Sequence, residues 1–175
     1  MSCKATLRRE MIEKRKALCL KNGEMFVKMI RGLDIYQRAK TVMLYMPIKG
    51  EADVTGLFAD KKLFLLPVTF GEDMFAAVAG ETEIGNFNVP EPKDKAPFDK
   101  EKIDLVIVPG VVFDHQCNRA GYGKGYYDRF LKDMKAFKIG VCHSFQIVDE
   151  IESEAHDIKM DMIVTERDVW TRENI

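Results

Sequence analysis

The chain has 175 residues, of which 46% are hydrophobic and 31% charged, and its formal net charge is −1. This length predicts one domain, spanning residues 1–175, with a sizeable buried core. A charge balance so close to neutral excludes a general basic field for nucleic acid or a membrane surface, so any anion site must be local.

The first nine residues are polar and basic and lack the apolar run of a secretory signal. The longest apolar stretch, 105–113, is far too short to span a bilayer and contains Pro109 and Gly110. We therefore expect a cytoplasmic protein. Its four cysteines are widely spaced with no C-x-x-C pair, which disfavours a zinc site and predicts free thiols.

The N-terminal half predicts helices followed by strands. Residues 3–20 predict a helix that ends at Asn22-Gly23, and residues 24–31 predict a second helix. Apolar runs predict strands at 41–46, stopped by Pro47, at 62–68, ending near Pro67, and at 74–79. Between the first two strands, residues 53–60 predict a short helix capped by Asp53.

The C-terminal half alternates strands with loops. Three prolines predict a loop over 85–97, and 103–108 is the clearest buried strand. After a glycine-rich loop come a helix from about 125 to 134, a strand at 138–142, an irregular segment at 147–158, a strand at 162–165 and an edge strand at 169–171. Apolar strands alternating with helices predict an α/β sandwich with a largely parallel sheet.

The most informative segment is the glycine-rich loop, in which Gly121, Gly123 and Gly125 alternate with other residues. Glycine lets the backbone approach a ligand closely, and successive N–H groups in such a loop can converge on an anion. Arg119 and Lys124 add positive charge, and the carboxylate of Asp128 suits a hard cation. These parts suit a loop that binds polyphosphate and places Mg²⁺ beside it.

Two common phosphate motifs do not fit this loop. A P-loop requires Ser or Thr after Gly123-Lys124, where this chain has Gly125. The dinucleotide fingerprint requires a third glycine where this chain has Tyr126. The alternative interpretation is a surface turn that leads into a helix. The loop follows the strand at 103–108, so we expect it at the carboxyl edge of the sheet, where ligands bind in such folds.

Other candidate residues lie outside the loop. Lys4 and Arg8 share one face of the first helix, where they could hold a phosphate or form a solvated basic end. Glu51 could hydrogen-bond a polar heterocycle or be a solvated loop carboxylate. Asp128 could instead pair with Lys132 one turn later. Asp157 could cap a turn or contact a metal.

Taken together, these segments resemble the 5-formyltetrahydrofolate cyclo-ligase family (5,10-methenyltetrahydrofolate synthetases). The stretch from Val108 to Arg129 is similar to the family signature P-G-x-x-F-D followed by R-x-G-x-G-x-G-Y-Y-D. Shorter matches run in order along the chain: Lys4-x-x-x-Arg8 with K-x-x-L-R, Glu51-Ala52-Asp53 with E-x-D, 88–92 with the central proline loop, and 156–157 and 164–166 with the C-terminal H-D and V-T-E.

The resemblance implies a three-layer α/β/α sandwich and an ATP-dependent, Mg²⁺-requiring ring closure of 5-formyltetrahydrofolate to 5,10-methenyltetrahydrofolate. Residues implied to bind ATP are Lys4, Arg8, Arg119, Gly121, Tyr122, Gly123, Lys124, Gly125, Tyr126 and Tyr127, with Arg119 and Lys124 also catalytic. Folate-binding residues would be Met46, Glu51, Tyr122 and Tyr126, and Mg²⁺ ligands would be Asp128 and Asp157. The partners expected are small molecules only, and the protein is expected to be a monomer or weak homodimer.

Two positions depart from the family pattern. Cys117 stands where the family often has glycine, which predicts a strained or altered turn. Ala120 replaces a common leucine, which predicts looser packing beside Arg119. Two other functions stay open: a catalytically silent folate- and nucleotide-binding regulatory module, and a sugar-phosphate isomerase or acyl transferase on a related fold, which would not need ATP.

Overall fold

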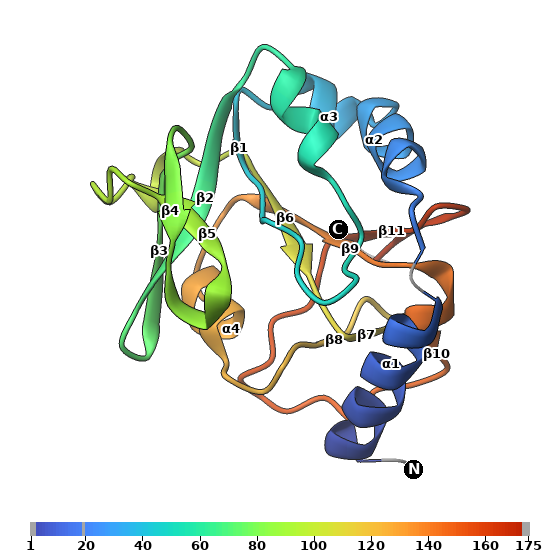
Figure 1. Cartoon of the computed structure of the whole chain (residues 1–175). Helices are drawn as coiled ribbons and strands as arrows, with labels where there is room; N and C mark the ends of the chain where they lie inside the picture. The colour runs from blue at the N-terminus through green and yellow to red at the C-terminus, as the bar shows by residue number, and fades with distance from the viewer. Residues whose placement is uncertain (1–2, 19, 173–175) are drawn as a thin grey trace.

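A seven-stranded sheet, ordered β12-β11-β9-β6-β1-β2-β3, runs through the centre of the molecule (Figure 1). The structure is a computed structural model and describes residues 3–18 and 20–172. The strands of this sheet are β1 (Thr41–Met43), β2 (Leu63–Phe70), β3 (Asp73–Val78), β6 (Leu105–Pro109), β9 (Phe137–Val141), β11 (Met162–Val164) and β12 (Val169–Thr171).

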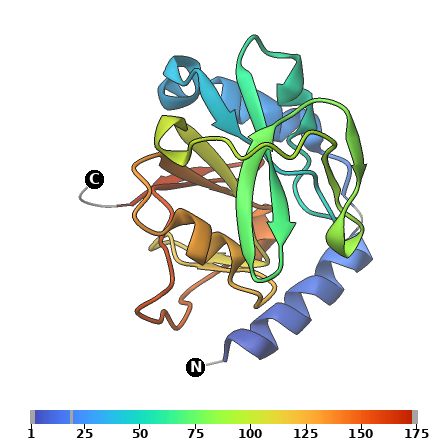
Figure 2. The same ribbon diagram turned by 90° about the vertical axis from the view of Figure 1, so that its left-hand side faces the viewer.

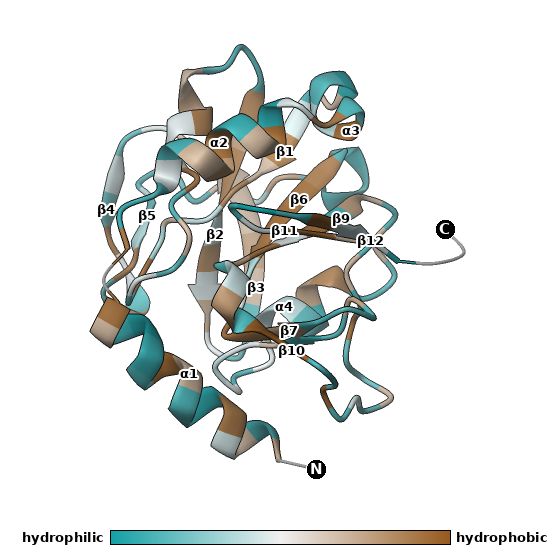
Figure 3. Cartoon of the chain, turned by 90° about the vertical axis from the view of Figure 1, so that its right-hand side faces the viewer, coloured by the Kyte–Doolittle hydropathy of each residue, from teal (hydrophilic) through white to brown (hydrophobic). Residues whose placement is uncertain are grey.

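Neighbouring strands from β2 to β11 are parallel, and only the two edge strands, β3 and β12, pair antiparallel. Leu105 to Val108 of β6 are all buried, because layers cover both faces of the sheet. Figure 3 shows β6, β9 and β11 as apolar ribbons in the interior. The predicted α/β fold with a largely parallel sheet is confirmed.

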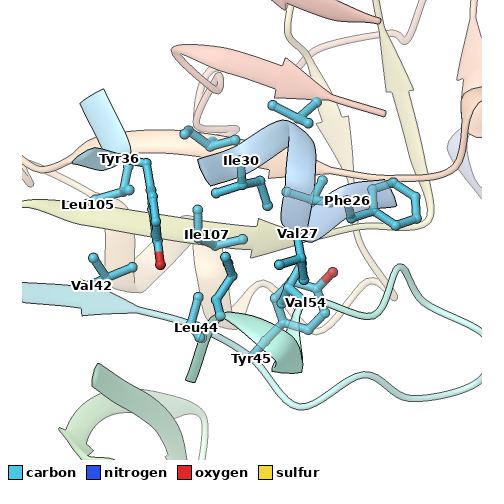
Figure 4. Close-up of a cluster of buried hydrophobic side chains, with 14 of the residues drawn as sticks. Phe26, Val27, Ile30, Tyr36, Val42, Leu44, Tyr45, Val54, Leu105 and Ile107 are labelled. Carbon is cyan, nitrogen blue, oxygen red and sulfur yellow. The ribbon is translucent and has the colours of Figure 1, made fainter. Parts of the chain in front are cut away.

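Helices cover both faces of the sheet. The α-helices are α1 (Lys4–Leu18), α2 (Gly23–Arg31), α3 (Asp34–Arg38) and α4 (Tyr126–Leu131). On one face, Phe26 and Ile30 of α2 pack with Leu44 and Ile107 in a fully buried cluster (Figure 4). Helix α4 lies on the other face (Figure 2). Its Phe130 and Leu131 pack in a second cluster. Two cores separated by a sheet produce the three layers.

Helix α1 stands apart from these layers and closes one side of the molecule (Figure 3). Its Met11 packs with Val111, Val112, Ala120 and Ile151 in a third, smaller cluster. These residues lie on or beside a three-stranded sheet, ordered β10-β7-β8 and made of β7 (Val112–Asp114), β8 (Arg119–Ala120) and β10 (Ile147–Val148). The small sheet therefore attaches α1 to the end of β6.

The structure corrects several predictions. The segment predicted as a loop over 85–97 contains strand β5 (Pro90–Pro92), which pairs with β4 (Thr82–Ile84) as a hairpin. The helix predicted over 53–60 is a 3₁₀-helix, η1 (Thr55–Ala59), although Asp53 does accept hydrogen bonds from Thr55. The helix predicted over 125–134 ends at Leu131. The other 3₁₀-helices are η2 (Asn86–Asn88), η3 (Lys100–Lys102) and η4 (Ser144–Gln146).

Pro67 does not end β2, which continues to Phe70. Leu65 O accepts from Leu44 N, whereas Phe64 O accepts from Ala79 N, so alternate residues of β2 face β1 and β3. Pro67 falls on the β1 side, beyond the paired part of β1, and its missing N–H costs no sheet hydrogen bond.

Cys3, Cys117 and Cys142 are free thiols, as predicted, and Cys19 lies outside the described residues. Among the helices of residues 3–18 and 20–172, none is both long and apolar enough to cross a membrane.

Candidate active site

A cavity of about 660 Å³ opens beyond the carboxyl ends of β1 and β6. Its walls come from α1, the segment after β1, the hairpin around η2, the glycine-rich loop and the segment at 154–157. Every residue that the sequence assigned to a site lines it: Lys4, Arg8, Met46, Glu51, Arg119, Gly121, Tyr122, Gly123, Lys124, Gly125, Tyr126, Tyr127, Asp128 and Asp157. The expected position of the loop at the sheet edge is confirmed.

A larger cavity of about 1030 Å³ lies on the other side of segment 47–56, against α2. The two cavities share only Glu51 among their lining residues, and Glu51 is the only predicted site residue that lines the larger one. The smaller cavity is therefore the candidate active site.

The glycine-rich loop crosses the cavity in a conformation that needs its glycines. Gly123 and Gly125 have φ values of 94° and 71°, in the left-handed region where a side chain costs energy. Arg8 Nε donates to Gly121 O at 2.6 Å, which attaches α1 to the loop. The ammonium of Lys124 has no hydrogen-bond or ion-pair partner within the described ranges, so it is available to an anion in the cavity.

Arg119 forms part of the buried wall of the cavity and is only 7% exposed. Its Nη1 donates to Pro109 O at 3.0 Å, its Nη2 lies 3.6 Å from Asp128 Oδ2, and its guanidinium lies 5.3 Å from the ring centroid of Tyr127. Burial lowers the pKa of Arg119, but a guanidinium stays charged in proteins. Its Nε is buried and has no hydrogen-bond partner.

Lys4 is paired with two carboxylates at the cavity wall. Its Nζ lies 2.5 Å from Asp157 Oδ2 and 3.1 Å from Glu154 Oε1. Burial opposes the charge on Lys4, but its bonds to the two carboxylates outweigh burial and raise its pKa. Burial likewise acts against ionisation of Asp157, yet hydrogen bonds from Glu154 N and Lys4 lower its pKa. Lys4 is therefore a positive charge that two carboxylates hold in place at the cavity wall.

The two carboxylates assigned to Mg²⁺ lie on neighbouring segments. Asp128 Oδ1 accepts from Ile158 N at 3.1 Å, which brings α4 beside Asp157. Asp128 faces Arg119 and forms no pair with Lys132, which follows the end of α4. No group of three or more His, Cys, Asp or Glu residues suited to a metal occurs among the described residues. Two carboxylates alone make an incomplete site, which suits an ion that also binds phosphate oxygens.

Glu51 is not a solvated loop carboxylate. Its Oε2 accepts from Ile48 N at 3.0 Å, and its backbone N–H donates to Ile48 O. Burial raises the pKa of Glu51 to about 7, although Ile48 N, Arg15 and nearby Tyr122 act in the opposite direction. The Glu51 side chain is only partly exposed, and its exposed part faces the two cavities. Such a carboxylate can accept hydrogen bonds from a polar ring.

Aromatic side chains border the cavity near the hairpin. Tyr126 Oη donates to Gly71 O at 2.8 Å, and the Tyr126 ring meets Phe87 edge-on, with 6.1 Å between centroids. Phe87 lies in η2 with a φ of 56° and is 60% exposed. Prediction from the sequence did not single out several residues that line the cavity, namely Tyr45, Lys49, Thr69, Met74, Asn86, Phe87 and Glu154. The proline-rich match at 88–92 was the one sequence signal for the hairpin.

Comparison with known proteins agrees with this arrangement. The sequence model of the 5-formyltetrahydrofolate cyclo-ligase family matches residues 1–166. The chain belongs to this family. It is therefore an enzyme of the cyclo-ligase class, and the resemblance noted in its sequence is confirmed.

Cyclo-ligases from several organisms align with most of this chain. The probable 5-formyltetrahydrofolate cyclo-ligase of Schizosaccharomyces pombe is 31% identical, over 79% of this chain and 80% of that protein. The cyclo-ligase of Mycoplasma pneumoniae is 29% identical, over 93% of this chain and 98% of that protein. The NMR structure of the Aquifex aeolicus 5,10-methenyltetrahydrofolate synthetase superposes with a TM-score of 0.87 at 34% identity, covering 98% of this chain and 94% of that one.

The two departures from the cyclo-ligase pattern lie in and just before β8, which leads into the glycine-rich loop. Cys117 has a φ of 64° and is fully buried in the turn between β7 and β8, where Asp114 accepts hydrogen bonds from Gln116 N and Asn118 N. A non-glycine residue is strained in this left-handed conformation, as the sequence predicted. Ala120 is buried against the third cluster.

Proposed function

We propose that this protein uses ATP and Mg²⁺ to convert 5-formyltetrahydrofolate into 5,10-methenyltetrahydrofolate, releasing ADP and phosphate. The observation that carries the proposal is the single cavity that gathers Arg8, Arg119 and Lys124 with the Glu51 carboxylate and aromatic walls. The cations suit a triphosphate, and the carboxylate and aromatic rings suit a reduced pterin.

The chemistry explains why both ligands belong in one cavity. Hydroxide is a poor leaving group from the formyl carbon. Transfer of the γ-phosphoryl group to the formyl oxygen breaks the bond to ADP and turns that oxygen into a phosphate leaving group. N10 then bonds to the activated carbon, loses its proton, and phosphate departs with the carbon–oxygen electron pair. Catalysis by the protein is mainly positioning and charge stabilisation.

We assign each cation a role according to whether it already has a hydrogen-bond or ion-pair partner in the protein. Lys124 has no other partner among the described residues, and we assign it to the transferring phosphoryl group. Arg119 is held rigidly by Pro109 O and stabilises charge from the buried side. Lys4 and Arg8, with the loop backbone from Gly121 to Gly125 and its tyrosines, bind the rest of the triphosphate and nucleoside.

Asp128 and Asp157 would hold Mg²⁺. The fit rests on their donor chemistry, because Mg²⁺ binds in proteins through one or two carboxylates and completes its shell with water and substrate phosphates. When bound, the ion would neutralise charge on the phosphates. The carboxylates themselves position Lys4 and Arg119, through the contacts at 2.5 and 3.6 Å.

The folate side of the cavity is formed by Met46, Glu51, Tyr122 and Tyr126. Glu51 accepts hydrogen bonds from the polar edge of the pterin, and Met46 and Tyr126 pack on its apolar surface.

The deciding experiment mixes the protein with 5-formyltetrahydrofolate, ATP and Mg²⁺ and follows the absorbance of the methenyl product, with ATP omitted as the control. We expect product formation that requires ATP and releases one ADP per turnover. Binding of both ligands without turnover would instead identify a catalytically silent regulatory module. A reaction that proceeds equally without ATP would also contradict the proposal.

A further inference from the structure

Arg15 is a buried cation that the assignments above leave unexplained. It lies on α1 and is only 2% exposed. A buried charge costs several kcal/mol unless hydrogen bonds satisfy its donors, so a buried arginine is retained for a structural or functional reason. Arg15 does not line the active-site cavity, so any influence on the reaction must pass through the residues that it holds.

The guanidinium of Arg15 joins three segments that do line the cavity. Its Nε donates to Lys49 O at 2.8 Å, its Nη1 donates to Gly110 O at 3.3 Å, and its Nη2 donates to the hydroxyl of Tyr122. Lys49 precedes Glu51 by two residues, Gly110 follows β6, and Tyr122 belongs to the glycine-rich loop. One side chain therefore sets the spacing of the folate side of the cavity.

The Lys49 turn needs such a restraint. Lys49 and Gly50 both have positive φ, at 49° and 77°, and a left-handed non-glycine residue costs roughly 1–2 kcal/mol. Arg15 holds the turn from one side, and His143 Nε2 lies 3.0 Å from Gly50 O on the other. Release of the turn would move Glu51 before it affected the sheet.

The same helix carries the phosphate-side cations. Lys4 and Arg8 lie eleven and seven residues before Arg15, a spacing that places all three on one face of a helix. Arg8 Nε donates to Gly121 O, one residue before Tyr122. Helix α1 is thus a rigid connection between the two ends of the cavity.

We propose that Arg15 is a positioning residue that fixes the Glu51 turn and Tyr122 relative to the cationic face of α1, and thereby couples folate binding to nucleotide binding. The role of Arg15 rests on the proposed function, in which the two ends of the cavity are the folate and nucleotide subsites. Arg15, Arg119 and the phenols of Tyr45, Tyr122 and Tyr127 interact electrostatically with Glu51. The other charged or titratable groups nearby are Asp53 beside Tyr45, Lys49 over the Tyr122 ring, and His143 at Gly50 O. Of the two arginines that act on Glu51, only Arg15 has no ligand assigned to it.

The test compares Arg15→Met, which keeps the length of the side chain but removes its charge and donors, with Arg15→Lys and with Lys16→Met. Lys16 is an exposed cation on the same helix and serves as the matched control. Calorimetry measures binding of 5-formyltetrahydrofolate with and without a non-hydrolysable ATP analogue, and steady-state assays give kcat and KM.

For Arg15→Met we expect the KM for folate to rise at least tenfold, with a change of less than threefold in the affinity for the ATP analogue alone. The analogue should no longer strengthen folate binding. The pH below which folate binding weakens should move upward, because loss of a nearby cation favours the protonated form of Glu51. Arg15→Lys should recover part of the loss, and Lys16→Met should match the wild type.

An unchanged folate KM and pH dependence in folded Arg15→Met would overturn the inference, even if the melting temperature fell. If Arg15→Met does not fold, Tyr122→Phe removes only the hydroxyl that Arg15 binds, and an unaltered folate KM and pH dependence there would overturn it equally. If the wild type and Lys16→Met form no methenyl product, the proposed function fails instead. If the wild type and Lys16→Met both form product normally, the result for Arg15→Met tests the positioning role separately from the proposed function.

Discussion

Glu51 holds its carboxylate among phenolic and apolar neighbours, where burial raises its pKa to about 7 from an ordinary value of 4.5. As the pH rises from about 4.5 to 7, the unfolded chain releases this proton while the folded protein retains it. Folding therefore becomes less favourable across that window, and the full cost remains above pH 7.

Glu51→Gln should consequently stabilise the protein at pH 8 while impairing folate binding. By linkage we expect a gain of about 1–3 kcal/mol in the free energy of unfolding at pH 8 and almost none at pH 4. Urea unfolding of both proteins at the two pH values measures it. Equal unfolding free energies at pH 8 would show that the carboxylate is not held at a cost.

Lys124→Ala should weaken nucleotide binding by about ten- to hundredfold, because it removes a charge-assisted hydrogen bond to phosphate. The melting temperature should change little, since Lys124 is exposed and contacts no other described side chain through its ammonium. Titration with ATP by calorimetry measures the effect, with Lys132→Ala as an exposed-lysine control outside the cavity. Unaltered affinity and rate in Lys124→Ala would remove this residue from the site.

Asp128→Asn should raise the Mg²⁺ concentration for half-maximal activity at least tenfold, because a neutral amide is a weaker ligand for a hard cation. Rates measured across a Mg²⁺ titration at fixed ATP test this. Asp133→Asn changes an exposed carboxylate just past the same helix and should behave as the wild type. An identical Mg²⁺ dependence in Asp128→Asn would place the ion elsewhere.

At this scale, the sequence predicted residues that line one cavity but not their contacts. Lys4, Arg119 and Asp128 were grouped by the family motifs that they match, because helical spacing alone left Lys4 open as a solvated basic end. The pair between Lys4 and Asp157 spans 153 residues and depends on how the sheet closes. Helical spacing places Arg15 on the same stripe as buried Met11, but it does not reveal the carbonyl groups and the hydroxyl that Arg15 binds.

The hairpin of β4 and β5 brings Phe87 to the rim of the cavity, beside Tyr126. An exposed aromatic ring next to a proposed pterin subsite gains contact area when the ligand binds. Phe87→Ala should raise the KM for folate about 2–10-fold, the range expected from one aromatic contact. Phe70→Ala, which removes an exposed ring at the end of β2 outside the cavity, is the control. Equal KM values in the two variants would exclude a folate contact at Phe87.

Long apolar runs predicted the large elements of the fold, whereas several short elements were not predicted from the sequence. Strand β6 was recognisable because its first four residues, Leu105 to Val108, are apolar and suited to a buried parallel strand. The prolines at 90 and 92 suggested a loop, but both fit an edge hairpin, where a missing N–H is tolerated. Helix α3 and strands β7 and β8 have five, three and two residues, too few to show a period.

At the scale of the whole molecule, ligands that bind only the folded cavity must stabilise the entire domain. ATP with Mg²⁺ at a hundred times its Kd should add about 2.7 kcal/mol, which raises the melting temperature of a domain of this size by roughly 5–10 °C. Thermal melts at increasing ATP concentration measure the shift. Lys124→Ala should need proportionally more ATP for the same shift, and a shift that persists unchanged without Mg²⁺ would contradict the metal's role.

Helix α1 comes from the first residues of the chain, yet its Lys4 meets Asp157 and its Arg8 meets the loop at Gly121. During synthesis this helix therefore leaves the ribosome long before its partners exist, and this wall of the cavity is completed only after Asp157 has been made. A single protease cut between α1 and α2 would leave only noncovalent contacts, among them those of Lys4 and Arg8 and the cluster around Met11, to hold the first helix against the cavity.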